Sequence, residues 1–143
     1  MSIVVEPTKK IIGYYLVLQE TNDTFPWSIH GLWPEYEGDY HNYPKCQCNS
    51  KSTVEPSLLN EMHNDWHSEK RFHHTDKWLW HHEWKKHGAC IFHDSKTYFQ
   101  FTIKIFNYVK SKGLNWFIAR SIKHVRERWL PLDINFKTKK IVF

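Results

Sequence analysis

The first apolar segment of the chain, residues 13–20, is rich in Tyr, Leu and Val and predicts a central β-strand. Residues 27–30 predict a second strand, which delivers His30 at its end. The polar segment 35–51 is interpreted as a loop. The N-terminal third therefore predicts two strands followed by a long connection.

Helical patterns dominate the middle of the chain. Pro56 and the residues after it predict a helix that runs to about Ser68. A second helix is predicted over 78–89, and a third over 95–111, where Gly113 ends it. The apolar stripe of the third helix contains Tyr98, Phe101, Ile105 and Tyr108.

The C-terminal part predicts one more helix over 115–128, and one or two closing strands over 132–143. Together these elements predict a single α+β domain over residues 1–143, with several helices packed on a central antiparallel β-sheet. A chain of 143 residues with 41% hydrophobic residues is large enough to build one core. The net charge of +5 favours a polyanionic partner, although charge alone does not identify one.

The helix predicted over 78–89 concentrates reactive side chains. Successive residues turn by roughly 100°, so His82, Lys86, Glu83 and His87 fall at roughly 0°, 40°, 100° and 140° around the helix. Trp84 points elsewhere and is predicted to anchor the helix in the core. Trp80 is also predicted to be a core residue. One helix therefore carries most of a candidate active site.

Two imidazoles with a carboxylate and an ammonium group suit the cleavage of RNA by its own 2′-hydroxyl. That reaction needs a base for the 2′-hydroxyl proton, an acid for the leaving 5′-oxygen and cations near the phosphate oxygens. Histidine serves either proton transfer, because its ordinary pKa of roughly 6.5 lets one copy start neutral and another start charged. The reaction requires no metal or other cofactor.

Two segments, Ile29 to Pro34 and His82 to Cys90, resemble the active-site segments of the base-nonspecific acid ribonucleases of the T2 family. The usual forms in that family are IHGLWP and HEWxKHGTC. Only Ala89, where the family usually has Thr, departs within the second segment. The resemblance covers roughly residues 13–130 and lacks the longer N-terminal and C-terminal parts that are usual in the family.

The resemblance implies a role for each residue of the two segments. His87 would be the general base, His30 the general acid, and His82 would hold the phosphate. Glu83 and Lys86 would stabilise the transition state. The implied products are a 2′,3′-cyclic phosphate and, after slower hydrolysis, a 3′-phosphate.

The implied substrate is single-stranded RNA, bound with little base specificity. Trp33 matches the stacking tryptophan of the family, and a flat aromatic face binds any base. Glu35 stands where relatives often carry Asp, and it would accept a hydrogen bond from an exocyclic amine. Tyr40 is a second candidate for stacking.

A metal site is the main competing hypothesis, since the chain has eleven histidines. A zincin needs HExxH, whereas this chain has HExxxH, with Lys86 where the second ligand would lie. The other histidines are interpreted as surface or helix-face residues: His41, His63, His67, His73, His74, His81, His93 and His124. A noncatalytic RNA-binding module and a histidine-rich metal-binding protein remain the alternatives.

The resemblance pairs Cys90 with a cysteine that follows the first segment, and spacing favours Cys46 over Cys48. Such a bridge would stabilise the fold by roughly 3–4 kcal/mol through the unfolded chain. In a reducing compartment all three cysteines would remain thiols.

Residues 1–10 lack the continuous apolar stretch of a secretory signal, because Glu6, Lys9 and Lys10 interrupt it. We therefore expect either a processed chain or a protein that works inside cells. Asn22 begins a glycosylation sequon, which matters only in the secretory path. The chain is expected to act as a monomer, without a membrane span or an obligate protein partner.

Overall fold

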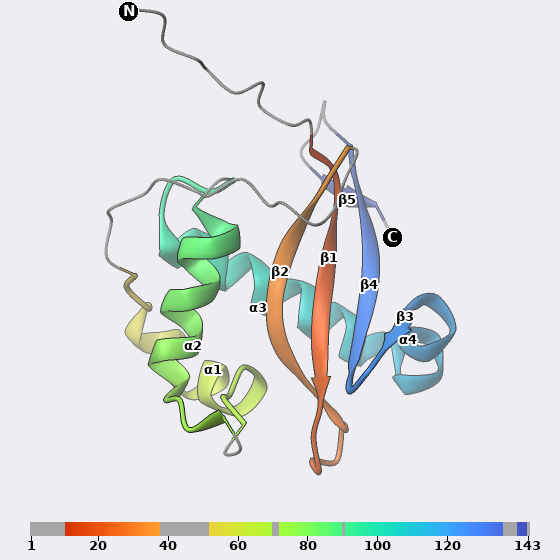
Figure 1. Ribbon diagram of the computed structural model, residues 1–143, viewed down its shortest axis with the longest axis horizontal. Helices are drawn as coiled ribbons and strands as arrows, with labels where there is room; N and C mark the ends of the chain where they lie inside the picture. The colour runs from red at the N-terminus through yellow and green to blue at the C-terminus, as the bar shows by residue number, and fades with distance from the viewer. Residues whose placement is uncertain (1–10, 38–51, 70–71, 90, 136–139, 143) are drawn as a thin grey trace, which may run out of the picture.

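The computed structural model describes residues 11–37, 52–69, 72–89, 91–135 and 140–142 (Figure 1). The described strands are β1 (Ile11–Glu20), β2 (Trp27–Tyr36), β3 (Ile122–His124), β4 (Glu127–Asn135) and β5 (Lys140–Val142). The helices are the 3₁₀ turn η1 (Pro56–Leu58), α1 (Leu59–Asp65), α2 (Asp76–Glu83), the π-helix η3 (Trp84–Gly88), α3 (Ser95–Lys112) and α4 (Leu114–Arg120).

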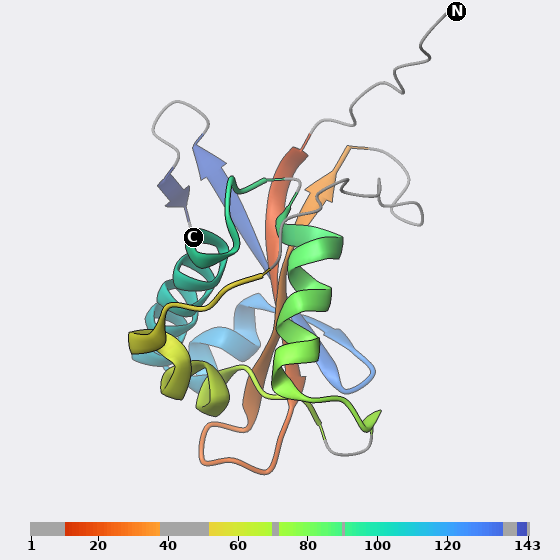
Figure 2. The ribbon, with the colours of Figure 1, turned by 90° about the vertical axis from the view of Figure 1, so that its left-hand side faces the viewer.

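An antiparallel sheet forms the centre of the molecule, in the order β2-β1-β4-β3, and β5 pairs with β4. One face of the sheet is apolar, and Leu16 of β1 lies between Leu32 of β2 and Leu130 of β4. The helix α3 crosses the sheet and buries Phe99 and Phe106, while α2 lies along the β2 edge (Figures 1 and 2). The predicted α+β class and the central position of β1 are confirmed.

The strand β2 is longer than the sequence pattern predicts. It continues to Tyr36, so His30 lies inside the strand and not at its end. Val17 pairs with Gly31 and Leu18 pairs with Ile29, which leaves His30 as the extra residue of a β-bulge. Bulges redirect side chains in this way near active sites.

The second predicted helix has two parts. Thr75 caps α2, because its side-chain oxygen accepts a hydrogen bond from the Trp78 amide at 3.1 Å. The chain then widens into the π-helix η3, a form that is often found at functional sites. Trp80 and Trp84 are both buried, as predicted.

The third predicted helix is confirmed as α3, and Gly113 ends it with a φ of 94°. Tyr108, predicted to belong to the apolar stripe, is exposed at 38%. The first predicted helix is also shorter than expected, since α1 ends at Asp65.

The predicted helix over 115–128 is wrong beyond Arg120. There the chain turns into β3 and β4, and the reversal puts Arg126 at a φ of 57°. Pairing of β4 with β1, which is distant in the sequence, overrides the local helical pattern. Among the described helices, none is long and apolar enough to cross a membrane.

Candidate active site

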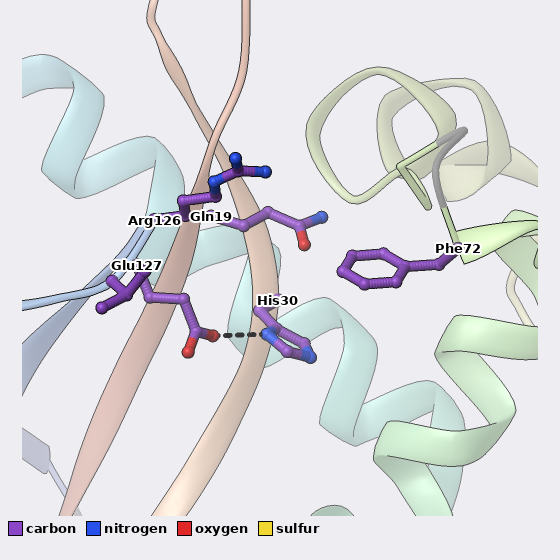
Figure 3. A pocket seen from close by; sticks show the side chains of 6 residues that line it. Gln19, His30, Phe72, Arg126 and Glu127 are labelled. Carbon is purple, nitrogen blue, oxygen red and sulfur yellow. Dashed lines mark hydrogen bonds and ion pairs between the residues drawn. The ribbon is translucent and has the colours of Figure 1, made fainter.

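His30 projects from the bulge of β2 toward the start of β4. Its Nδ1–H donates a hydrogen bond to Oε2 of Glu127 over 2.6 Å, and both side chains are partly buried (Figure 3). Burial lowers the pKa of His30, but the bond to Glu127 and the charges of Glu83 and Glu127 outweigh it. The pKa of His30 therefore lies above its ordinary value, which favours the charged imidazolium.

Glu83, the last residue of α2, is buried against β2. Its Oε1 accepts a hydrogen bond from the indole N–H of Trp33 over 2.6 Å. The backbone of Gly31 lies so close that a Cβ there would overlap Oε1 of Glu83 and approach Nε1 of Trp33 to 2.6 Å. Burial raises the pKa of Glu83 to about 7, against the opposing effects of His30, the Trp33 bond and Lys86.

His87 lies in η3 and is only 1% exposed. Its ring stacks on Trp33, with the centroids 4.7 Å apart, and His30 meets the same indole at 5.1 Å with a tilt of 70°. Both imidazoles thus contact one tryptophan. Burial, together with the positive charges of Lys86 and His30, lowers the pKa of His87 to about 2, so its ring is held neutral.

The four side chains on one side of this helix differ in exposure: they are His82, Glu83, Lys86 and His87. Glu83 and His87 are buried, while His82 and Lys86 are exposed. The ring of His82 stacks on Trp78 with centroids 4.9 Å apart. Burial and the charge of Lys86 lower the pKa of His82. The exposed residues act electrostatically on the buried His87, because Lys86 and His82 both lower its pKa.

A pocket of about 480 Å³ opens beside His30. The side chain of Phe72 is 54% exposed, and it lies opposite His30 across the pocket (Figure 3). The other residues that line it are Gln19, Val125, Arg126 and Glu127. Sequence reasoning missed this pocket and the partner of His30, because Glu127 sits between two arginines in a stretch predicted as helix and gives no signal of its own.

The other residues predicted from the sequence lie apart from these contacts or outside the described residues. Glu35 is half-buried on β2, opposite Gly13, and its Oε2 would lie 3.4 Å from a Cβ at that glycine. Tyr40 and the predicted bridge between Cys46 and Cys90 lie outside the described residues. Asn22 is exposed in the turn between β1 and β2.

Several other histidines make local contacts away from the candidate acid and base. His63 pairs with Asp76 at 2.6 Å, and His67 with Asp23 at 3.2 Å. In the described part of the chain, no three or more His, Cys, Asp or Glu side chains are grouped so that they could hold a metal ion.

The chain is similar to known ribonucleases. Residues 8–127 match the model of the ribonuclease T2 family. A ribonuclease T2-like protein of Aspergillus fumigatus is 38% identical over 77 residues, which cover 46% of this chain and 17% of that protein. Intracellular ribonuclease LX of Solanum lycopersicum is 35% identical over 78 residues, which cover 52% of this chain and 32% of that protein.

Each of these alignments thus spans less than half of the relative. Among solved structures, ribonuclease MC1 from the seeds of bitter gourd aligns with a TM-score of 0.49 and 19% identity, over 68% of this chain and 58% of that one. The family model, in contrast, includes both segments that carry the candidate site, and it covers well over half of the chain. The chain belongs to the ribonuclease T2 family.

Proposed function

We propose that the protein is an endoribonuclease that cleaves single-stranded RNA with little base specificity, through a 2′,3′-cyclic phosphate to 3′-phosphate ends. One observation carries the proposal. Two imidazoles contact the same indole, and their pKa values are shifted in opposite directions, up for His30 and down for His87. An acid and a base that begin in opposite protonation states are what this reaction needs.

In the proposed first step, neutral His87 takes the proton of the 2′-hydroxyl, whose oxygen then attacks the phosphorus. Charged His30 gives a proton to the leaving 5′-oxygen. The Nδ1 of His30 is occupied by Glu127, and the other ring nitrogen points away from that carboxylate and is the proton donor (Figure 3). Hydrolysis of the cyclic phosphate then runs the two roles in reverse.

In this proposal the phosphate lies near the ammonium group of Lys86 and the ring of His82. Lys86 and His82 are exposed and electrostatically coupled to His87, which suits contacts with the phosphate oxygens. Glu83, with a pKa of about 7, bridges the helix and Trp33 and stabilises the arrangement near the phosphorus. The reaction as proposed uses no metal ion.

The pocket beside His30 is the proposed place for the nucleoside that carries the leaving oxygen, with the exposed Phe72 ring as a surface for its base. Trp33 is the proposed stacking partner for the base on the other side of the phosphate, assisted by Glu35 and Tyr40. His87 covers one face of the Trp33 indole, and the rings of His30 and Trp129 lie 5.1 and 5.2 Å from it between centroids, so a base would use the part of the indole that these three rings leave uncovered.

The test is cleavage of the four RNA homopolymers, with and without EDTA, followed by detection of the cyclic phosphate. We expect cleavage in EDTA, and we expect His30→Ala and His87→Ala to lose more than a hundredfold in kcat while they still bind RNA. His63→Ala is the matched control, because His63 lies on α1 and pairs with Asp76 at the start of α2, away from the candidate acid and base. Turnover of either active-site variant within a few-fold of wild type would refute the proposed roles.

The same experiment separates the alternatives. Cleavage that EDTA abolishes would support a metal-dependent protein. RNA binding without any cleavage would support a noncatalytic binding module.

A further inference from the structure

We infer that Glu127 is a positioning residue for His30, which fixes the orientation of that ring and stabilises its charged form. The inference rests on the proposed function and assigns a role to a carboxylate outside both active-site segments. Glu127 begins β4 and is 97 positions from His30 in the sequence.

The geometry of the sheet brings the two residues together. Glu127 pairs with Gln19 of β1, and Gln19 pairs with Ser28 of β2, so β1 separates the two strands. The carboxylate therefore reaches across the central strand. The bulge in β2 turns His30 toward it, and the 2.6 Å bond ties Nδ1 to Oε2 (Figure 3).

This bond determines what His30 can do. A ring that donates Nδ1–H to a carboxylate has its other nitrogen turned away from that carboxylate, as in other acid–base sites where a second group orients a histidine (Figure 3). The carboxylate also stabilises the charged ring. Without Glu127, the ring would be able to rotate, and its charged form would lose its nearest anion.

Other charged and titratable groups also act on His30 or lie near it: Glu69, His82, Glu83, Lys86, His87 and Arg126. Of the carboxylates, Glu83 loses its charge as the pH falls below about 7, because burial raises its pKa. Glu83 therefore stops supporting the charge of His30 in acid. Glu127 is the carboxylate in direct contact, and its side chain is 25% exposed.

The test compares Glu127→Gln with Glu127→Asp and with Glu20→Gln as the matched control. Glu20 ends β1, and its backbone amide donates to the Arg126 carbonyl over 3.0 Å, so the control removes a carboxylate beside the same turn. Two quantities are measured: the pH profile of kcat/KM on a homopolymer, and the titration of the His30 ring by NMR, assigned with His30→Gln.

The direction of the expected pH shift follows from the proposed role of His30 as the acid. The acid must be protonated, so its pKa sets the basic limb of the profile. We expect Glu127→Gln to move the basic limb and the NMR titration of His30 to lower pH by about one unit, a loss of about tenfold in activity on that limb. Glu127→Asp should recover part of the shift, and Glu20→Gln should show none.

An unchanged His30 titration and an unchanged basic limb in Glu127→Gln would overturn the inference. If Glu127→Gln does not fold, Glu127→Ala supplies the comparison, and a His30 titration equal to wild type in that variant would be equally decisive. If the wild-type protein cleaves no RNA, the proposed function fails, whereas the His30 titration still decides whether Glu127 holds its charge.

Discussion

Gly31 shows how a single missing side chain allows the two active-site segments to meet. A Cβ at this position would overlap the Glu83 carboxylate and crowd the indole N–H of Trp33. The glycine therefore lets the strand approach the helix closely enough for the 2.6 Å bond between Trp33 and Glu83. Glycine is required at position 31 because of the lack of space for a side chain and not because of the backbone conformation, since Gly31 has no positive φ.

Gly31→Ala is expected to lower kcat by at least tenfold and to destabilise the fold by roughly 1–3 kcal/mol, because a buried carboxylate and an indole must both move. The measurement pairs kinetics on a homopolymer with urea unfolding. Gly113→Ala is the matched control, since its Cβ meets no atom but its φ of 94° is unfavourable for alanine. The control should lose stability and keep its kcat; equal kcat for wild type and Gly31→Ala would contradict the argument.

At the level of elements, the local pattern predicted α3, the central strand and the helix that carries His82 to His87. It did not predict the bulge at His30 or the π-helix, since both depend on packing between distant segments. The residues of the candidate site came from the two short segments. Glu127 did not, because its role depends on the pairing of β4 with β1.

The π-helix brings its own packing requirement. Gly88 closes η3, and a Cβ there would lie 2.7 Å from Cε3 of Trp84 and 2.8 Å from the ring of Tyr98. Tyr98 in turn holds β2, because its hydroxyl lies 3.2 Å from the Leu32 amide, which donates to it, and donates to the Leu32 carbonyl. The buried Gly88 of η3 therefore packs against α3, which in turn holds β2 through Tyr98.

Gly88→Ala should accordingly destabilise the protein by roughly 1–3 kcal/mol, because Trp84 and Tyr98 are both buried and have no room to yield. Urea unfolding measures the loss. Because His87 is the adjacent residue, we also expect kcat to fall in the fraction that remains folded. A substitution that leaves both quantities unchanged would mean that η3 relaxes to accept the methyl group.

At the scale of the whole molecule, the order of the strands determines where the candidate active site lies. The sheet ends at β2, so its open edge accepts the helix α2, while β1 and β4 lie behind it (Figure 2). One of the two histidines therefore comes from a strand, and the other from a helix that packs on it. The arrangement buries His87 as part of the fold and not as a surface group.

Burial of neutral His87 makes the stability of the whole protein depend on pH. In the unfolded chain this histidine gains a proton below about pH 6.5, whereas in the folded protein its pKa is lowered to about 2. Between those pH values His87 binds more protons in the unfolded state than in the folded state. The contribution of His87 to stability is therefore present above pH 6.5 and is lost as the pH falls. The contribution of Glu83 has the opposite sign between about pH 4.5 and 7, because its pKa is raised.

The comparison of wild type with His87→Gln isolates the histidine. His87 is neutral in the folded protein over this range, so its removal leaves the field at Glu83 unchanged. The free energy of unfolding of wild type, relative to His87→Gln, should fall by about 1.6 kcal/mol from pH 6.5 to pH 5. Urea unfolding at several pH values measures it, and a difference that stays constant with pH would mean that His87 accepts a proton as easily in the folded protein as in water.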